Sequence, residues 1–225
     1  MGRSVAANRD SRVRVITDSH AFGGHLHDTY RNIANLMLVE SRHVTIRYEM
    51  ARRSAVAIIA PHAGSIEPFT GELAEAIAGD EHRLYCFSGS TRENSHRLHV
   101  TSTHFSEPVL TRVLLGATLA LTVHGCRYPL EPVTHLGGTN HQLRNRLERS
   151  LAQAGFAVDR ALAPMAGRHP HNVVNRTIQG GVQLEITRYQ RRALNEDRKL
   201  EQSHGDTCSC LFCRYVAAVR VVLEP

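Results

Sequence analysis

The chain has 225 residues, of which 42% are hydrophobic and 21% are charged, proportions that are ordinary for a folded globular protein. No apolar run approaches the roughly 18 residues of a membrane-spanning helix, and the charged N-terminus, MGRSVAANRDSRVRV, lacks the apolar core of a secretion signal. We therefore expect a soluble protein that is cytoplasmic as synthesised and has no membrane partner.

The net charge of +6, counted with neutral histidines, favours an acidic partner but does not identify it. Lys and Arg are scattered, Trp is absent and no aromatic-basic pattern is found, so nucleic acid is not the favoured partner. The cysteines number five and follow no secretion signal, which argues against a disulfide framework.

Taken in chain order, hydrophobic periodicity predicts helices that alternate with short apolar strands. After an irregular N-terminal segment over residues 1–27, helices are expected over 28–40, 70–78, 107–115, 140–154 and 211–223, and strands over 56–60, 84–87, 119–123, 156–158 and 182–187. Asp28 is the candidate cap of the first helix. Thr70 is the candidate cap of the second helix, which Gly79 would end. No Pro/Gly/Ser-rich linker divides residues 28–225, which predicts one domain. Its class is α/β, with a mixed, largely parallel sheet flanked by helices.

Residues able to do chemistry lie at or near three of these strands. His62 follows the first apolar strand, His124 follows strand 119–123, and Glu185 lies inside VQLEIT. In such sheets the working crevice lies beyond the carboxyl ends of the strands. A carboxylate in an apolar strand has to be paired or to face a polar cavity, although alternation could also place Gln183 and Glu185 on a solvated face.

A zinc site is one way to use these residues. Zinc accepts imidazole nitrogen and carboxylate oxygen, and a catalytic site commonly keeps three protein ligands and one open position. His62, Glu67 and His124 could supply that set, with Gly64 helping the chain to turn back, and Glu185 would be the general base. The alternative is a set of hydrogen-bonded turn residues, since fifteen histidines make a chance pairing easy.

Six segments in one order carry a family resemblance. They are APHAGSIEPFTGELAEAIAG, LYCFSG, LHVTSTHFSEP, VHG, NVVNR and GVQLEITR. Together they resemble the poly-γ-glutamate hydrolase family, which includes proteins labelled phage-related replication proteins, over roughly residues 28–195.

The resemblance implies a zinc carboxypeptidase-like fold, one catalytic Zn²⁺ and cleavage of γ-glutamyl amide bonds. It implies His62, Glu67 and His124 as metal ligands and Glu185 as the catalytic carboxylate. A phage-related origin would allow extracellular action after phage lysis. The partner would be an anionic γ-glutamyl polymer or peptide.

The chain departs from the family pattern at a few positions. Ala63 replaces a second glycine of the turn, and Phe69 stands where a smaller residue is common, so the pocket rim is expected to differ. The cluster His204, Cys208, Cys210 and Cys213 lies outside the family pattern. It could hold a structural zinc or could be a loop with free thiols.

Substrate-binding groups are less sharply indicated. Each residue of a γ-glutamyl chain carries an α-carboxylate, which a guanidinium group binds well as a planar fork. Arg176 is the first candidate and Arg127, just past His124, the second; His99 and Thr101 could line the same crevice. The alternative for each is an ordinary solvated side chain.

Two other functions remain open from the sequence. A zinc amidase or peptidase could act on γ-glutamyl bonds of peptidoglycan or on small acyl-amino acids. A non-catalytic nucleic-acid-binding accessory protein would use the positive charge alone and would give Glu185 no role. Oligomeric state, glutamate stereochemistry and endo or exo cleavage are not determined by these patterns.

Overall fold

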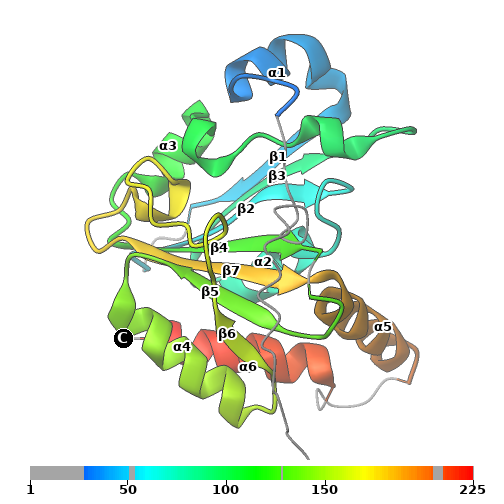
Figure 1. The fold of residues 1–225 in the computed structure, drawn as a ribbon, viewed down its shortest axis with the longest axis vertical. Coiled ribbons are helices and arrows are strands. Elements are labelled where there is room, and N and C mark those ends of the chain that lie inside the picture. Colours follow the sequence, from blue (N-terminus) through cyan, green and yellow to red (C-terminus); the bar gives the residue numbers. More distant parts are fainter. Residues whose placement is uncertain (1–27, 51–53, 128, 205–209, 225) are drawn as a thin grey trace, which may run out of the picture.

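Seven strands form one twisted sheet that crosses the molecule (Figure 1). The computed structural model describes residues 28–50, 54–127, 129–204 and 210–224, without the side chains of residues 201–204; the predicted segment 1–27 lies outside them. The strand order is β1-β3-β2-β4-β7-β5-β6. The bounds are β1 Val44–Glu49, β2 Val56–Gly64, β3 Arg83–Gly89, β4 Leu119–Cys126, β5 Thr134–Gly138, β6 Val158–Arg160 and β7 Gly181–Thr187.

Parallel pairing dominates the sheet. The pairs β2–β3, β2–β4, β4–β7 and β5–β6 are parallel, whereas β1–β3 and β5–β7 are antiparallel. Parallel strands need crossover connections, which helices commonly supply. The α/β class with a mixed, largely parallel sheet is therefore confirmed.

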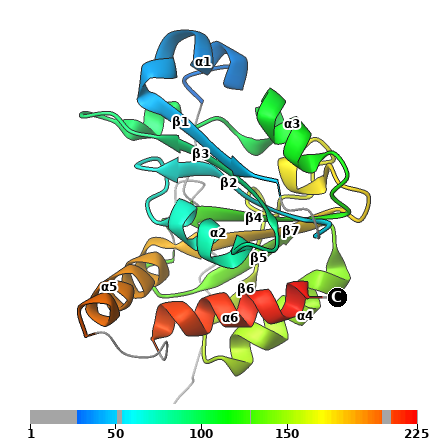
Figure 2. The ribbon, with the colours of Figure 1, turned by 180° about the vertical axis from the view of Figure 1, so that it is seen from behind.

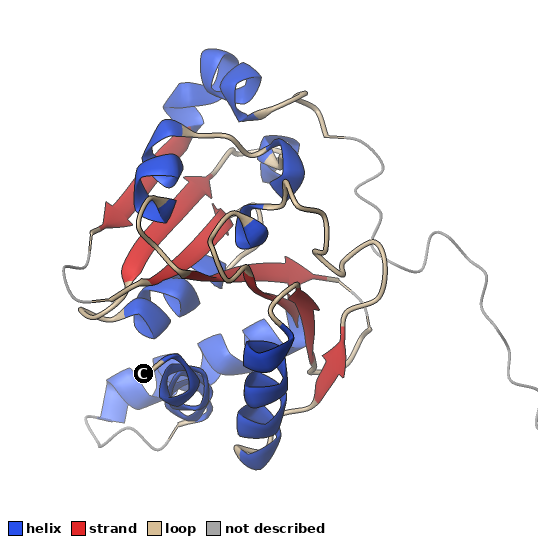
Figure 3. Cartoon of the chain, turned by 90° about the vertical axis from the view of Figure 1, so that its left-hand side faces the viewer, coloured by secondary structure: helices blue, strands red, loops and turns tan. Residues whose placement is uncertain are grey.

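Helices cover both faces of the sheet (Figures 2 and 3). They are α1 Ile33–Glu40, α2 Thr70–Ala78, α3 Pro108–Leu114, α4 His141–Gln153, α5 Arg188–His204 and α6 Leu211–Leu223. Helices α2, α4 and α6 share one apolar cluster with the sheet, and α1 and α3 share the other. No helix among the described residues is both long and apolar enough to cross a membrane.

Strand β2 shows how alternation makes two cores. Ile58 and Ala60 join the cluster beneath α2 and α6, while Ala57 and Ile59 join the opposite cluster. All four are fully buried. A strand covered on both faces reads as a continuous apolar run, which is what VAIIA is.

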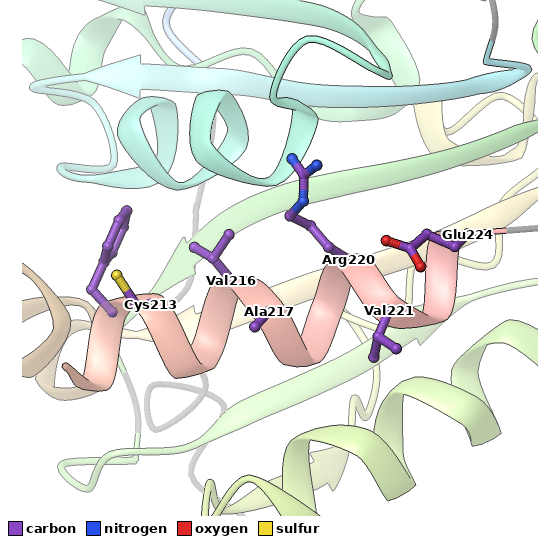
Figure 4. A pocket seen from close by; sticks show the side chains of 7 residues that line it. Cys213, Val216, Ala217, Arg220, Val221 and Glu224 are labelled. Atoms are coloured by element: carbon purple, nitrogen blue, oxygen red, sulfur yellow. The ribbon is translucent and has the colours of Figure 1, made fainter. Parts of the chain in front are cut away.

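Helix α6 is fastened to α2 by an arginine. Arg220 points toward α2 (Figure 4), donates to the carbonyls of Ala76 and Ile77 at 3.4 and 3.3 Å, and pairs with Glu81 at 2.7 Å. Gly79 ends α2 with φ of +50°, and a Cβ there would overlap the Arg220 guanidinium. The side chain thus satisfies carbonyls that the end of a helix leaves without partners.

Several predicted elements are confirmed almost residue for residue. Helices 70–78 and 211–223 have the predicted bounds, and the strands predicted over 56–60, 84–87, 119–123 and 182–187 exist. The strand predicted over 156–158 was misplaced, because β6 begins only at Val158. Helix α3 begins at Pro108, one residue after the predicted start, with Glu107 as its cap, and α4 begins after Asn140. Strand β2 runs to Gly64, so His62 lies in the strand rather than after it.

Other predictions about helix starts were wrong. Helix α1 begins only at Ile33, capped by Asn32 and not by Asp28, whose carboxylate binds elsewhere. The cap residue of α2 is Phe69, in the left-handed region at φ of 75°, and the Thr70 hydroxyl instead donates to the Glu67 carbonyl at 2.8 Å. Strands β1 and β5 and helix α5 were not predicted.

Candidate metal centre

His62 has a fixed ring orientation near the end of β2. Its Nε2 lies 2.9 Å from the Val100 carbonyl oxygen and its Nδ1 lies 3.0 Å from Glu67 Oε1. Because a carbonyl oxygen only accepts hydrogen bonds, Nε2 carries a proton. In the neutral ring the Nδ1 lone pair therefore points at Glu67, as in a metal-binding histidine whose second nitrogen is held by the protein.

Glu67 is held between the ends of two strands. Its backbone N–H donates to the His62 carbonyl at 2.8 Å, which closes the turn after β2. Its Oε2 accepts a 2.8 Å hydrogen bond from the Gly125 N–H at the end of β4. The turn requires Gly64, with φ of +72°, because a Cβ there would lie 2.8 Å from the Gly89 carbonyl oxygen.

His124 brings a second imidazole to the same point. Its Nδ1 lies 3.2 Å from His62 Nδ1 and 3.6 Å from Glu67 Oε2. Its Nε2 lies 3.5 Å from the Ser102 hydroxyl. Two ring nitrogens that face one another at this distance need a proton or a cation between them.

The donor set fits zinc. Ligand atoms about 2.0–2.1 Å from a tetrahedral zinc lie about 3.3 Å from one another. His62 Nδ1 lies 3.2 Å from His124 Nδ1 and 3.0 Å from Glu67 Oε1, and the other oxygen of Glu67, Oε2, lies 3.6 Å from His124 Nδ1. His62, Glu67 and His124 are all buried. His62, Glu67 and His99 also each place one ligand atom within 4.8 Å of the others, so a fourth donor adjoins the site.

The electrostatics of this cluster favour a positive charge. Burial opposes ionisation of Glu67, but the charge of His62 and hydrogen bonds from both histidines hold its pKa well below the usual value. Burial likewise opposes protonation of His62, yet the Glu67 carboxylate raises its pKa overall. A divalent cation would take over the role of these protons.

Glu185 lies on the neighbouring strand. In the parallel pairing of β4 and β7 it is in register with His124, so the two side chains share a face of the sheet. It is buried, not solvated, and its Oε1 accepts a 2.7 Å hydrogen bond from the Gln183 amide. Burial raises the pKa of Glu185 to about 7, a value suited to taking and returning a proton near neutral pH.

The sequence as a whole matches a known family. The family model for poly-γ-glutamate hydrolase matches residues 30–218. The chain belongs to the poly-γ-glutamate hydrolase family. It is therefore an enzyme of a hydrolase family, and the resemblance inferred from six short segments is confirmed.

Relatives and solved structures agree with this assignment. The UPF0714 protein YmaC of Bacillus subtilis is 32% identical over 201 residues, 88% of this chain and 84% of YmaC. The SPbeta prophage-derived UPF0714 protein YoqZ of the same organism is 31% identical over 197 residues, 85% and 70% of the two chains. A bacteriophage poly-γ-glutamate hydrolase structure superposes with TM-score 0.77 at 35% identity, over 87% of this chain and 96% of its own. Zinc-free YndL superposes with TM-score 0.70 at 28% identity, over 75% and 84%.

In this hydrolase, His99 adjoins the cluster of His62, Glu67 and His124 and is oriented by Asp28. His99 Nδ1 lies 2.9 Å from Asp28 Oδ1, and its Nε2 lies 4.0 Å from Glu67 Oε1. The backbone N–H of Thr101 donates to Asp28 Oδ2 at 2.7 Å. Burial opposes ionisation of Asp28, but these hydrogen bonds lower its pKa. The sequence suggested Asp28 only as a helix cap and not as a partner of His99, because His99 is 71 residues away.

The two candidate substrate arginines of the hydrolase lie in different settings. Arg176 donates to the carbonyls of Phe105 at 2.8 Å and His171 at 2.8 and 3.0 Å, so much of its fork is used by the backbone. Arg127 is exposed directly after β4. The substrate roles of Arg176, Arg127, His99 and Thr101 stay predictions.

The departures from the family pattern lie outside the cluster of donor atoms. Phe69 is buried, with its ring centroid 5.7 Å from that of Phe212 on α6. Cys210 caps α6, where its Sγ accepts from the Cys213 N–H at 3.2 Å. Cys213 is disulfide-bonded, so the expectations of a loop with free thiols and of a zinc held by this cysteine were both wrong. Cys208 and the side chain of His204 lie outside the described residues.

Proposed function

We propose that this chain is a zinc-dependent hydrolase of γ-glutamyl amide bonds whose substrate is poly-γ-glutamate. The observation that carries the proposal is the convergence of His62, Glu67 and His124 at spacings that suit tetrahedral zinc. The zinc-free state of YndL and the bacteriophage poly-γ-glutamate hydrolase, both similar to this chain, support it.

The metal supplies two kinds of chemistry when bound: it lowers the pKa of a coordinated water and polarises the scissile carbonyl. Glu185 would accept a proton from the attacking water and return it to the leaving nitrogen as the C–N bond breaks. The products are a carboxylate and a protonated amine, which together account for both protons of the water and leave Glu185 ionised as before. Gln183 orients the Glu185 carboxylate through its hydrogen bond.

The remaining groups would act on substrate placement. His99 lies next to Glu67 and is held by Asp28, which also accepts a hydrogen bond from the backbone of Thr101. The net charge of +6 favours the approach of an anionic polymer. High salt screens the charges and weakens this attraction. A non-catalytic nucleic-acid-binding role has no support from membership in a hydrolase family.

The test is hydrolysis with and without metal. Purified protein is expected to hold about one zinc per chain and to shorten poly-γ-glutamate, measured by size-exclusion chromatography. A chelator should abolish the cleavage, and added zinc should restore it. Release of fragments from peptidoglycan but not from poly-γ-glutamate would keep the chemistry and overturn the substrate; no zinc and no cleavage would overturn both.

A further inference from the structure

Arg191 is a buried arginine that the proposed reaction does not yet use. It lies in the first turn of α5, and only 7% of its surface is exposed. Its Nε donates to the Ile186 carbonyl at 3.1 Å, and its Nη1 donates to the Pro68 carbonyl. Removing a charged guanidinium from water costs free energy, so we expect a buried arginine to be retained for a reason other than packing.

The residues that Arg191 contacts have one property in common: each directly follows a residue of the site. Pro68 follows Glu67, and Ile186 follows Glu185. Gly125, which follows His124, lies against the guanidinium so closely that a Cβ there would be 2.5 Å from Arg191 Cζ. One guanidinium therefore meets the backbone beside two proposed ligands and the proposed base.

Gly125 links this contact directly to a ligand. Its N–H holds Glu67 Oε2 at 2.8 Å, while its missing side chain leaves room for Arg191. Any larger residue would displace the guanidinium or the strand end. The glycine in the VHG segment is thus explained by Arg191, which lies 66 residues further along the chain.

The charge of Arg191 also suits this place. Among the described residues it forms hydrogen bonds to carbonyls and no ion pair within 4.0 Å of a carboxylate. Glu67 therefore stays available to a metal and Glu185 to a proton. The buried positive charge still stabilises both carboxylates through space.

We propose that Arg191 is a positioning residue, which joins the backbone after Glu67, His124 and Glu185 into one frame and so sets the metal ligands and the base relative to one another. The inference rests on the proposed zinc hydrolase function. It adds that the relative positions of the proposed ligands and base depend on α5, a helix that supplies none of the proposed metal ligands.

The chain offers a matched control in Arg220. This arginine also donates to two carbonyls and also lies against a glycine, Gly79, but it fastens α6 to α2 and touches no residue next to the site. Loss of either arginine removes the same type of hydrogen bond. Only loss of Arg191 is expected to change the site.

The experiment compares Arg191→Met with Arg220→Met. Zinc affinity is measured by competition with a chelator, kcat and KM on poly-γ-glutamate, and unfolding by heat with and without zinc. We expect Arg191→Met to lose roughly 10–100-fold in zinc affinity or kcat, as for other residues that orient ligands, with KM changed little. Arg220→Met should lower only the unfolding temperature.

Two further variants keep the test decisive if Arg191→Met does not fold. Arg191→Lys keeps the positive charge but has a single donor nitrogen in place of the guanidinium fork, and should retain part of the zinc affinity. Gly125→Ala leaves Arg191 in the chain but displaces it, and should give a loss like that of Arg191→Met. In the double variant with Arg191→Met the two losses should not add, because they remove one contact.

The inference is overturned if folded Arg191 variants bind zinc and turn over substrate like Arg220→Met. It is also overturned if Gly125→Ala leaves both properties unchanged. Failure of the proposed function looks different, because the wild-type protein itself would then bind no zinc or cleave no γ-glutamyl bond.

Discussion

Each end of the central sheet has an arginine that donates to backbone carbonyls, but the two arginines contact different residues. At the carboxyl ends of the strands, Arg191 donates to the carbonyls of Pro68 and Ile186, which follow Glu67 and Glu185, and lies against Gly125. At the amino ends, Arg220 contacts the last carbonyls of α2. Both arginines donate to backbone carbonyls, and Arg220 also pairs with Glu81; the residues next to each contact decide whether it bears on the proposed reaction.

The size of a hollow does not locate the chemistry either. The amino end borders a hollow of about 1360 Å³ lined by charges of both signs, including Arg47, Glu75, Glu81 and Arg146. The group of His and Glu that could hold a metal, as found among the described residues, lies at the other end. Donor atoms that converge in a buried place are the better guide.

The largest expected effect is the loss of zinc and hydrolysis on replacing His124, compared with replacing His82, another buried histidine. His124→Ala should lose zinc and hydrolysis together, because it removes one of three donors. His82→Ala is the control at the amino end, where His82 Nδ1 meets the Ser54 hydroxyl at 2.8 Å; it should keep both. Metal analysis and a turnover assay check this, and retention of zinc by His124→Ala would show the ligand assignment to be wrong.

A second contrast concerns two glutamates. Glu185→Gln should lower kcat by about 10²–10⁴-fold, the usual contribution of a general base, while the zinc content stays unchanged. Glu81→Gln, which only weakens the pairing with Arg220, should leave kcat unchanged. Equal turnover of the two variants would remove Glu185 from its proposed role.

Metal-free stability should depend on pH through Glu185. Its pKa is raised from 4.5 to about 7, so its favourable contribution is full below about pH 4.5 and is lost as pH rises through 7. Metal-free Glu185→Gln should therefore equal the wild type near pH 4 and exceed it at pH 8. The gain is on the order of 3 kcal/mol, since one pKa unit corresponds to about 1.4 kcal/mol.

Urea unfolding of the metal-free proteins at several pH values measures this difference. Glu67, whose pKa is lowered, gives the opposite trend, with stability lost as pH falls. Because the charge of Glu67 also raises the pKa of Glu185, the comparison is made between pH 4 and pH 8, where loss of the buried Glu185 carboxylate is the expected difference. A constant difference from pH 4 to pH 8 would contradict the effect of burial on Glu185.

The smallest expected effect lies at the amino end. Arg220→Met should lower the free energy of unfolding by about 1–2 kcal/mol, the worth of one or two hydrogen bonds, and the melting temperature by about 2–8 °C. Thermal unfolding of the zinc-loaded protein measures it. A change in kcat of the folded enzyme would mean that the two ends are not independent.

Some elements were predictable because their signals are local. Helix α6 has its apolar residues at helical spacing, and α2 ends at Gly79 as expected. Helix α5 is charged over most of its length, and β5, THLGG, is short and contains two glycines, so neither has the pattern of a buried element. Contacts from distant segments, not local preference, maintain them.

The candidate site divides in the same way. His62, Glu67, His124 and Glu185 were predicted from strand ends and family segments, and the structure brings these four together. Gln183 had a signal, since alternation places it on the face of Glu185. Asp28 and Arg191 had no such signal, because Asp28 binds His99 71 residues away and Arg191 reaches the Pro68 carbonyl 123 residues away.

The sequence by itself determined the class of fold, the family and the residue types of the site, because these depend on patterns within short segments. The tertiary structure decided that β4 and β7 are neighbours in register, that His62 turns its Nδ1 inward, and that Arg191 meets three distant turns. These features depend on strand pairing and on hydrogen bonds between segments far apart in the chain. No short segment encodes them alone.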